Sequence, residues 1–334
     1  MAPPSPETVW NADEKQLLTL LNSGTFTPHP KKVTFYAPSF MHYKTSVYCS
    51  SKNCFPTFSV TGETCALNCK HCGGKLLETM QPTETPEKLF EAAMKLKPLG
   101  SIGCLVSGGC TSTGSVPLGK FIPVMAKMKC DLGLTVIVHT GIIDYPTAAA
   151  LKSAGVDAAL IDIVGSDETI KQVCHLNLTA KDYENSLKAL NDARLNFVPH
   201  VIVGLQNGKL QGEFQALKMI AGFEPSALVV IAFMPIRGTM MEAVKPPSPS
   251  DIARVIAAAR LMFPKTPLAL GCIRPKGKLR HETDCLSLQA GVDAIAFPSG
   301  EAIRYAEEQG YETAFSPYCC SQIFVDVVAR SISK

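Results

Sequence analysis

The chain has 334 residues, 46% of them hydrophobic and 18% charged, which is the composition of a globular protein with ample apolar side chains for a core. The formal net charge is only +3, and like charges do not gather in blocks, so a nucleic-acid-binding or membrane-binding surface is not expected. The first residues lack a basic segment followed by an apolar run, and no apolar run of about eighteen residues follows. We therefore expect a soluble, cytoplasmic protein.

Thirteen cysteines stand out in this composition. Without a secretion signal they do not suggest a disulfide framework, and in a reducing compartment they indicate metal or redox chemistry. Cys104, Cys130 and Cys174 lie inside apolar or helical patterns, where a cysteine ordinarily acts as a small buried hydrophobe.

Residues 1–54 are predicted to form an N-terminal extension. An amphipathic helix is expected around Glu14 to Leu21, and a β-branched and aromatic segment follows near Val33 to Tyr36. Cys49 and Cys54 end this part as a candidate ligand pair; the alternative is two exposed loop thiols.

From Phe55 onward, short apolar runs alternate with helical patterns, the rhythm of repeated β-α units around a parallel sheet. Eight units favour a closed (β/α)8 TIM-type barrel over an open sheet, with residues 55–300 as the barrel and residues 301–334 as a segment that caps it. In such a barrel the chemistry lies at the carboxyl ends of the strands. The expected strands are Thr57 to Val60, Ile102 to Val106, Leu134 to His139, Ala158 to Ile163, Phe197 to Val203, Ala227 to Phe233, Pro267 to Gly271 and Ala294 to Phe297.

The first of these strands leads into a loop with three cysteines, Cys65, Cys69 and Cys72, spaced C-x3-C-x2-C. Structural zinc sites and ferredoxin-type clusters ordinarily take four protein ligands, so three thiolates leave one metal position open. An open position is a place for a substrate or cofactor to bind. The alternatives are a partial zinc knuckle or three incidental loop thiols.

This loop resembles the radical S-adenosylmethionine (radical SAM) superfamily. There, three cysteines hold a 4Fe-4S cluster whose fourth iron chelates the amino and carboxylate groups of S-adenosylmethionine. The resemblance implies reductive cleavage of that cofactor to a 5'-deoxyadenosyl radical, with an electron donor such as ferredoxin or flavodoxin. His71 departs from the family pattern, which usually has an aromatic residue before the last cysteine.

The second strand ends in Ser107, Gly108 and Gly109, which resemble the superfamily's Gly-Gly-Glu segment. The resemblance implies that backbone groups here meet the amino group of S-adenosylmethionine, since glycine lets a backbone approach closely. Cys110 stands where the family has an acidic residue. The alternative is an ordinary turn.

Two later strands carry further candidate cofactor contacts. Asp162, on the fourth strand, falls where biotin-synthase-like enzymes contact the ribose; the alternative is a solvated loop aspartate. The fifth strand, VPHVIVGL, matches the strand that flanks adenine in the superfamily, which makes His200 and Gly204 candidates. For His200 the alternative is a satisfied core histidine.

The phrases FMPIRGTMM, LALGCIRP and AGVDAIAFPS extend the resemblance to the biotin synthase branch over about residues 55–300. Biotin synthase holds a second, 2Fe-2S cluster with cysteines on strands two, three and five and an arginine on strand seven. The matching positions here are Leu105, Ile137 and Val198, and only Arg274 persists. A site without soft thiolate ligands is not expected to hold that cluster, so biotin synthesis is disfavoured.

New cysteines occur elsewhere: Cys272, two residues before Arg274, and the adjacent pair Cys319 and Cys320. If the C-terminal segment folds over the barrel mouth, these thiolates approach Cys272 and Cys110. We therefore predict an auxiliary 4Fe-4S cluster on Cys272, Cys319 and Cys320, its fourth ligand unassigned. For the adjacent pair the alternatives are a strained disulfide or no role.

The phrases CALNCKHC, SGGC, VPH, RGT and GCIRP resemble the archaeal-type two-component lipoyl synthases and their uncharacterised homologues. That resemblance implies sulfur insertion into an octanoyl chain on a carrier protein, with a second radical SAM protein as partner. Two alternatives stay open. One is a single-cluster enzyme of the biotin synthase branch that rearranges a substrate or transfers a methyl group. The other is a non-catalytic iron-sulfur or zinc protein on a barrel scaffold.

Overall fold

The structure, a computed structural model, describes residues 3–28 and 30–326. Within that part of the chain, eleven strands form one sheet in the order β11-β1-β10-β9-β8-β7-β6-β5-β4-β2-β3, and every strand pairing is parallel. The strands are β1 (Lys32–Tyr36), β2 (Thr57–Ser59), β3 (Gln81–Pro82), β4 (Gly103–Ser107), β5 (Thr135–His139), β6 (Ala158–Ile163), β7 (Phe197–Val203), β8 (Leu228–Ala232), β9 (Leu268–Leu270), β10 (Ala294–Ala296) and β11 (Glu312–Ser316).

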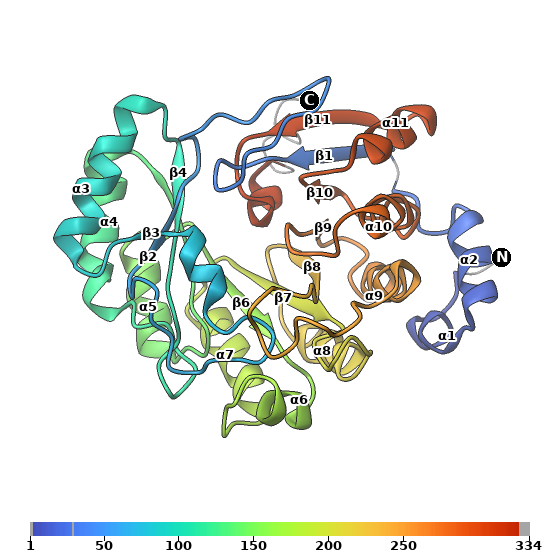
Figure 1. Ribbon diagram of the computed structural model, residues 1–334, viewed down its shortest axis with the longest axis horizontal. Helices are drawn as coiled ribbons and strands as arrows, with labels where there is room; N and C mark the ends of the chain where they lie inside the picture. Colours follow the sequence, from blue (N-terminus) through green and yellow to red (C-terminus); the bar gives the residue numbers. More distant parts are fainter. Residues whose placement is uncertain (1–2, 29, 327–334) are drawn as a thin grey trace.

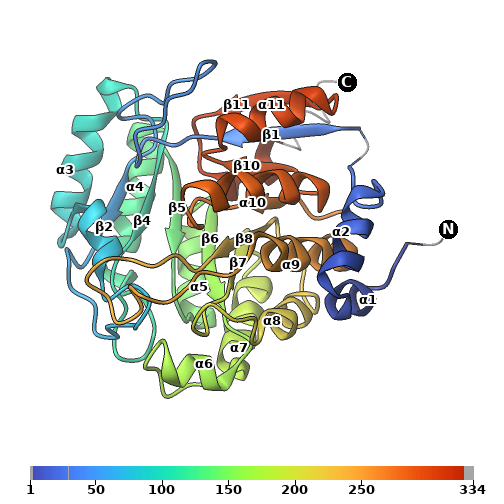
Figure 2. The same cartoon turned by 45° about the vertical axis from the view of Figure 1, so that its right-hand side comes forward.

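The sheet curls into an incomplete barrel with most helices on its outer side (Figures 1 and 2). The predicted (β/α)8 TIM-type fold is confirmed, and each of the eight predicted strands has its counterpart among β2 and β4 to β10. The described strands do not close the ring by hydrogen bonding, because β11 and β3 are the two edges of the sheet.

Helices follow the strands, as a parallel sheet requires of its crossovers. Several of their first turns are capped by the polar residue that precedes them; Asp144 Oδ1, for example, accepts a hydrogen bond of 3.0 Å from the backbone N–H of Thr147. The helices are α1 (Pro6–Asn11), α2 (Glu14–Asn22), α3 (Pro86–Leu96), α4 (Ile122–Leu132), α5 (Tyr145–Ser153), α6 (Asp167–Gln172), α7 (Ala180–Asp192), α8 (Glu213–Ile220), α9 (Pro249–Met262), α10 (Lys278–Gln289) and α11 (Gly300–Glu308), with short 3-10 turns η1 (Lys75–Thr79), η2 (Lys97–Leu99), η3 (Gly119–Phe121) and η4 (Cys320–Gln322).

Strands from both predicted extensions belong to the same sheet. β1 lies between β10 and β11, and Thr34 pairs with Ala294 on one side and Ala314 on the other. The helix predicted around Glu14 is α2, and the preceding α1 packs on α9. Arg254 of α9 fixes α1 by donating hydrogen bonds to carbonyl groups at its C-terminal end, which have no partner within the helix.

The interior of the curl is a separate apolar cluster. It is lined by small and branched side chains from many strands, and η4 contributes to it from the C-terminal segment. Its buried members are Tyr36, Ala37, Phe55, Ile137, Ala158, Leu160, Val198, Ala227, Val229, Ile231, Ala269, Ala294, Ala296, Phe297, Cys319, Cys320 and Ile323. In the described part of the chain, no helix has the length and apolar character needed to cross a membrane.

Candidate active site

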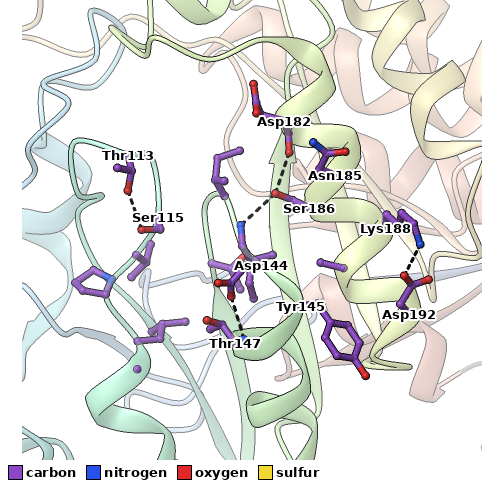
Figure 3. A pocket seen from close by; sticks show the side chains of 18 residues that line it. Thr113, Ser115, Asp144, Tyr145, Thr147, Asp182, Asn185, Ser186, Lys188 and Asp192 are labelled. Carbon is purple, nitrogen blue, oxygen red and sulfur yellow. Dashed lines mark hydrogen bonds and ion pairs between the residues drawn. The ribbon is translucent and has the colours of Figure 1, made fainter.

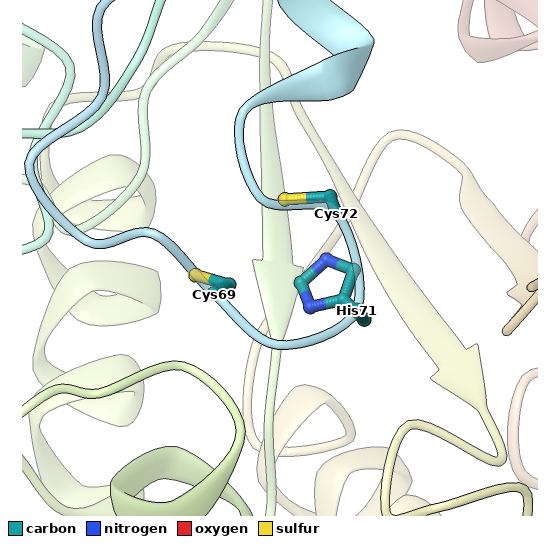
Figure 4. Close-up of side chains that lie close together, drawn as sticks. All are labelled: Cys69, His71 and Cys72. Atoms are coloured by element: carbon teal, nitrogen blue, oxygen red, sulfur yellow. The ribbon is translucent and has the colours of Figure 1, made fainter. Parts of the chain in front are cut away.

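The cysteine loop begins directly after β2, at the carboxyl end of the strand. Among the described residues, one group of three possible ligand atoms lies within 4.8 Å of one another, and it consists of Cys69, His71 and Cys72 (Figure 4). Cys65 lies outside this group but close to it. The thiol of Cys69 is hydrogen-bonded to Cys174, which together with burial and the nearby Cys65 raises its pKa.

Two other loops hold the cysteine loop in place. The backbone N–H of Ala66 donates to Cys110 O at 2.9 Å, and that of Lys70 donates to Val173 O at 2.9 Å. Cys69 Sγ lies 3.5 Å from the carbonyl oxygen of Cys174. Contacts from the connection after β4 and from the end of α6 therefore shape this loop.

These residues fit a cluster with an open iron. A four-iron cluster binds each thiolate to a different iron, so its ligand sulfurs lie farther apart than those around one metal ion. This accounts for Cys65 standing outside the tight group. His71 Nδ1 is buried and makes no hydrogen bond within the described structure, which leaves a polar atom beside the thiols for a bound group.

Gly109 brings the connection after β4 against the cysteine loop. A Cβ atom on this residue would lie 2.0 Å from Thr64 O and 2.6 Å from Cys65 Cα. The N–H of Gly109 donates to Thr61 Oγ1 at 2.7 Å. The close approach seen here is to the loop that carries the ligands, whereas the sequence predicted an approach to the cofactor.

The neighbouring residues of that segment are less constrained. Ser107 is buried at the end of β4, and its carbonyl oxygen accepts the N–H of Val60 at 2.7 Å. A Cβ on Gly108 would lie 3.0 Å from Thr61 Oγ1. Cys110 is partly buried, and its pKa is raised to about 12, mainly by desolvation of the thiol, with smaller contributions from Cys65 and Asp162.

Asp162 belongs to a polar ring near the carboxyl ends of β5 and β6 and in the middle of β7. Side chains alternate along a strand, so His139, Asp162 and His200 face the same interior as Ile137, Leu160 and Val198, which lie two residues earlier and are apolar. Asp162 Oδ1 lies 3.5 Å from His139 Nε2, and the rings of His139 and His200 are 6.0 Å apart. We call these three residues the polar ring.

The three groups of the polar ring influence one another. Burial alone would raise the pKa of Asp162, but His139 beside it lowers that pKa to about 2. Burial lowers the pKa of His200 to about 4, which keeps its imidazole neutral; its Nδ1 lies 3.1 Å from Val198 O. Sequence reasoning did not single out His139, although its place at the end of a strand was the available signal.

Gly204 forms the turn after β7 with a φ of +75°, a conformation that favours glycine. Its N–H donates to Glu213 Oε1 at 2.8 Å, and Pro247 lies where a side chain would be. Glu213 is buried, and its Oε2 has no hydrogen-bond partner among the described residues. The sequence analysis did not single out Glu213, because its hydrogen bond is to the backbone of Gly204, nine residues earlier in the chain.

The C-terminal segment brings its cysteines into the interior of the curl. After β11 the chain turns inward, so that Cys319 and Cys320 are buried in the interior cluster and Cys272 packs against it. Their three sulfur atoms do not all lie within 4.8 Å of one another in the described structure. The hydrogen bond from the Cys320 thiol lowers the pKa of Cys319, with help from Ser321 and His139.

Arg274 does not face an open ligand position. It is fully buried, its Nε donates to Asp284 Oδ1 at 2.7 Å, and its Nη1 donates to Gly271 O at 2.6 Å. Ile137 and Val198 are buried and apolar in the interior cluster. The positions compared with a 2Fe-2S site therefore present no soft ligand here.

A cavity of about 710 Å³ lies outside this arrangement. It is lined by the connections after β4 and β5 and by α7, with Asp144, Asp182 and Lys188 among its polar side chains (Figure 3). None of the cysteines or polar-ring residues is among those lining it.

The fold and the cysteine loop are those of a radical SAM domain, and comparison with known proteins agrees. Residues 59–209 match the family model for the Radical SAM superfamily. The crystal structure of HydG, a maturase of the FeFe-hydrogenase, superposes with a TM-score of 0.65 at 16% identity, over 98% of this chain and 76% of that one. The chain carries a radical SAM domain, whose cofactors are a 4Fe-4S cluster and S-adenosylmethionine.

Similar curated proteins include biotin synthases. Biotin synthase of Leptospira biflexa is 27% identical over 220 residues, which are 63% of this chain and 60% of that protein. Biotin synthase of Neorickettsia sennetsu is 26% identical over 254 residues, 72% of this chain and 74% of the other. Over these stretches the chain is similar to enzymes of the biotin synthase-like branch.

Proposed function

We propose that this radical SAM enzyme inserts sulfur into an unactivated C–H bond of an octanoyl chain on a carrier protein, as one component of a two-protein lipoyl synthase. The observation that carries the proposal is the placement of Cys319 and Cys320. They lie inside the barrel curl beside Cys272, on a different segment from the cysteine loop after β2. A second set of thiols at the barrel interior is what an auxiliary sulfur-bearing cluster needs.

In this proposal each set of residues has a separate role. Cys65, Cys69 and Cys72 would hold the first cluster, and Asp162 presents a carboxylate for the cofactor's ribose. When bound, that cluster and S-adenosylmethionine supply the radical that abstracts hydrogen from the substrate. Cys272, Cys319 and Cys320 would hold the auxiliary cluster, the sulfur source.

The interior below the polar ring supports an alkyl substrate. Ile137, Leu160 and Val198 are buried and apolar, and they offer no partner for a charged group. An octanoyl chain is uncharged along its length, and apolar walls exclude water from the reacting carbon. We propose that the carrier protein stays outside while its acyl chain enters the curl.

The direct test is anaerobic incubation of the reconstituted protein with reductant, S-adenosylmethionine and an octanoylated carrier peptide, with and without a candidate partner protein. Mass spectrometry should detect a peptide heavier by inserted sulfur, formed only with both proteins. Cleavage of S-adenosylmethionine without any sulfur-containing product, with about four irons per chain instead of about eight, would favour a single-cluster enzyme of this branch.

The double variant Cys319→Ala, Cys320→Ala tests the sulfur source. We expect it to keep 5'-deoxyadenosine formation, to lose about four irons and to lose any sulfur-inserted product. Cys130→Ala, at an exposed cysteine of α4, is the matched control. A double variant with the iron content of the wild type would contradict the proposed ligands.

A further inference from the structure

A groove of about 380 Å³ lies between the connections that follow β8 and β9. Both connections leave the carboxyl ends of neighbouring parallel strands, so the groove opens at the mouth of the curl. In barrels of this kind the carboxyl ends of the strands carry the chemistry. The groove is large enough for part of a substrate to enter, because ligand sites begin at about 300 Å³.

The two connections that form the groove also adjoin both sets of thiols. The connection after β8 touches the cysteine loop, since a Cβ atom on Gly73 would lie 3.8 Å from Thr239 Cγ2. The connection after β9 begins with Gly271 and Cys272, and Pro275 of the groove wall follows three residues after that cysteine. A substrate held in the groove is therefore next to the segments that carry both sets of thiols.

The walls of the groove are mainly apolar, and the charged residues that line it are all cationic. Met234, Ile236 and Leu279 line the groove together with three prolines. Arg237 and Lys276 are the charged members, and both are exposed. None of the described residues that line the groove is acidic. Neither cation forms an ion pair or a side-chain hydrogen bond with a described residue, so both positive charges are uncompensated.

The residues next to the groove preserve this positive charge. Exposed Lys245 directly precedes Pro246 of the groove wall. The connection after β8 contains one acidic residue, Glu242, and its Oε2 accepts the N–H of Gly238 at 2.6 Å. The cavity beside α7 has the opposite character, because three aspartates and one lysine line it.

The connection after β8 also exposes a large apolar side chain. Met240 is 71% exposed, the highest value among the large hydrophobic side chains that the structure describes. Methionine is enriched in protein–protein interfaces, and an exposed apolar residue beside an apolar groove is typical of a surface that contacts another protein.

We propose that this groove is the docking surface for the acylated carrier protein. The alkyl arm of the octanoylated lysine lies against the apolar walls, and acidic residues that flank that lysine pair with Arg237 and Lys276. Complementary charge speeds the encounter, disfavours basic partners and fixes the register of the complex. This inference rests on the proposed function, which supplies the acylated carrier.

The test measures binding of labelled peptides to the anaerobically reconstituted full-length protein by fluorescence anisotropy. Three peptides of equal length carry a central octanoylated lysine flanked by glutamates, by glutamines or by lysines. A fourth has the glutamates but no octanoyl group. Binding is measured at low and at high salt, and circular dichroism checks that each variant is folded.

The main variant is the double reversal Arg237→Glu, Lys276→Glu. Its matched control is Lys97→Glu, Lys152→Glu, which reverses two exposed cations in the 3-10 turn after α3 and in the last turn of α5. Chain leaving these turns leads to the amino ends of β4 and β6, so the control lies at the end of the barrel opposite the groove.

We expect the wild type to bind the glutamate peptide most tightly and the lysine peptide most weakly, with a preference that shrinks at high salt. The double reversal should weaken binding of the glutamate peptide about tenfold and strengthen binding of the lysine peptide, whereas the control should stay within about twofold of the wild type. Leu279→Asp should remove most of the gain in affinity that the octanoyl group gives.

The outcomes separate this inference from the proposed function. Equal binding of the three octanoylated peptides by the wild type, or a double reversal that binds the glutamate peptide like the wild type, overturns the docking surface. So does a control variant that loses as much affinity as the double reversal. The sulfur-inserted product is measured independently, and its absence beside an intact charge preference would overturn the proposed function while the groove still selected an acidic partner.

Discussion

At the scale of single residues, Gly109 decides how the connection after β4 meets the cysteine loop. A Cβ atom there would lie 2.0 Å from Thr64 O, so a side chain must displace backbone that carries Cys65. We expect Gly109→Ala to lose most of its iron after reconstitution and to be destabilised by about 1–3 kcal/mol. Iron analysis and chemical denaturation measure the two effects.

Gly119→Ala is the control for this prediction, because a Cβ on Gly119 meets no atom within 4 Å and its φ needs no glycine. It should change stability by less than about 0.5 kcal/mol. A Gly109→Ala protein that keeps its cluster but binds S-adenosylmethionine more weakly would show that the glycine faces the cofactor, as the sequence predicted.

His200 should make the stability of the fold depend on pH. Its pKa is lowered to about 4 by burial, whereas an unfolded histidine titrates near 6.5. Between these values the unfolded chain binds a proton that the folded one does not, so stability falls as the pH is lowered through this window. The full effect is about 3 kcal/mol.

Urea denaturation at several pH values between about 6.5 and 4 measures this effect. We expect His200→Leu to flatten the pH dependence, and the exposed His42→Leu to leave it as in the wild type. The other polar-ring residues act outside this window, since the pKa of His139 is raised and that of Asp162 is about 2. An unchanged slope in His200→Leu would show that His200 is charged in the folded protein.

At the scale of elements, α10 ties together the connections that follow β9 and β10. Asp284 of this helix accepts hydrogen bonds from Arg274 at 2.7 Å and from the N–H of Ser299, the N-cap of α11, at 2.8 Å. Arg274 and Asp284 are both fully buried. We expect Asp284→Ala to cost about 3–5 kcal/mol, because it leaves a buried charge without its partner.

Thermal or chemical denaturation tests this prediction against Asp131→Ala, which removes an exposed partner of Lys127 on α4 and should cost no more than about 1 kcal/mol. Replacing Arg274 and Asp284 together by apolar residues should restore part of the loss. If Asp284→Ala and Asp131→Ala were equally stable, the buried pair of Arg274 and Asp284 would not stabilise these connections.

At the scale of the whole molecule, the radical chemistry depends on one loop, while the fold depends on the sheet. We expect the variant Cys65→Ala, Cys69→Ala, Cys72→Ala to stay folded and to form no 5'-deoxyadenosine. The measurement is chromatography of the products after anaerobic reduction. Cys130→Ala should cleave S-adenosylmethionine like the wild type, and cleavage at that rate by the triple variant would contradict the role of the loop.

The predictions that the structure confirms were made from local patterns in the sequence. The eight barrel strands are apolar runs, and each has its counterpart in the structure. The spacing of Cys65, Cys69 and Cys72 predicted their role as cluster ligands, and that role stays a prediction. The membership of β1 and β11 in the sheet could not be predicted, because their pairing joins distant segments and their own patterns are short.

At the candidate site, the contacts within the polar ring likewise could not be predicted from local sequence patterns. Asp162 could be singled out by its place in a family pattern, but the partnership of His139 with Asp162 arises only from the pairing of β5 with β6 in the folded sheet. Arg274 was noted only as the one position retained from a 2Fe-2S site, and its pairing with Asp284 depends on where α10 packs.

The position of β1 between β10 and β11 has a consequence for the way the protein is made. Translation produces β1 among the first strands, whereas both of its hydrogen-bonding neighbours, which pair with Thr34 through Ala294 and Ala314, come near the end of the chain. A nascent chain therefore carries β1 with two bare edges while the rest of the sheet assembles, and bare strand edges recruit other chains. The first barrel strand to leave the ribosome is thus among the last to find its place, and a chain halted before β11 keeps one edge of β1 open.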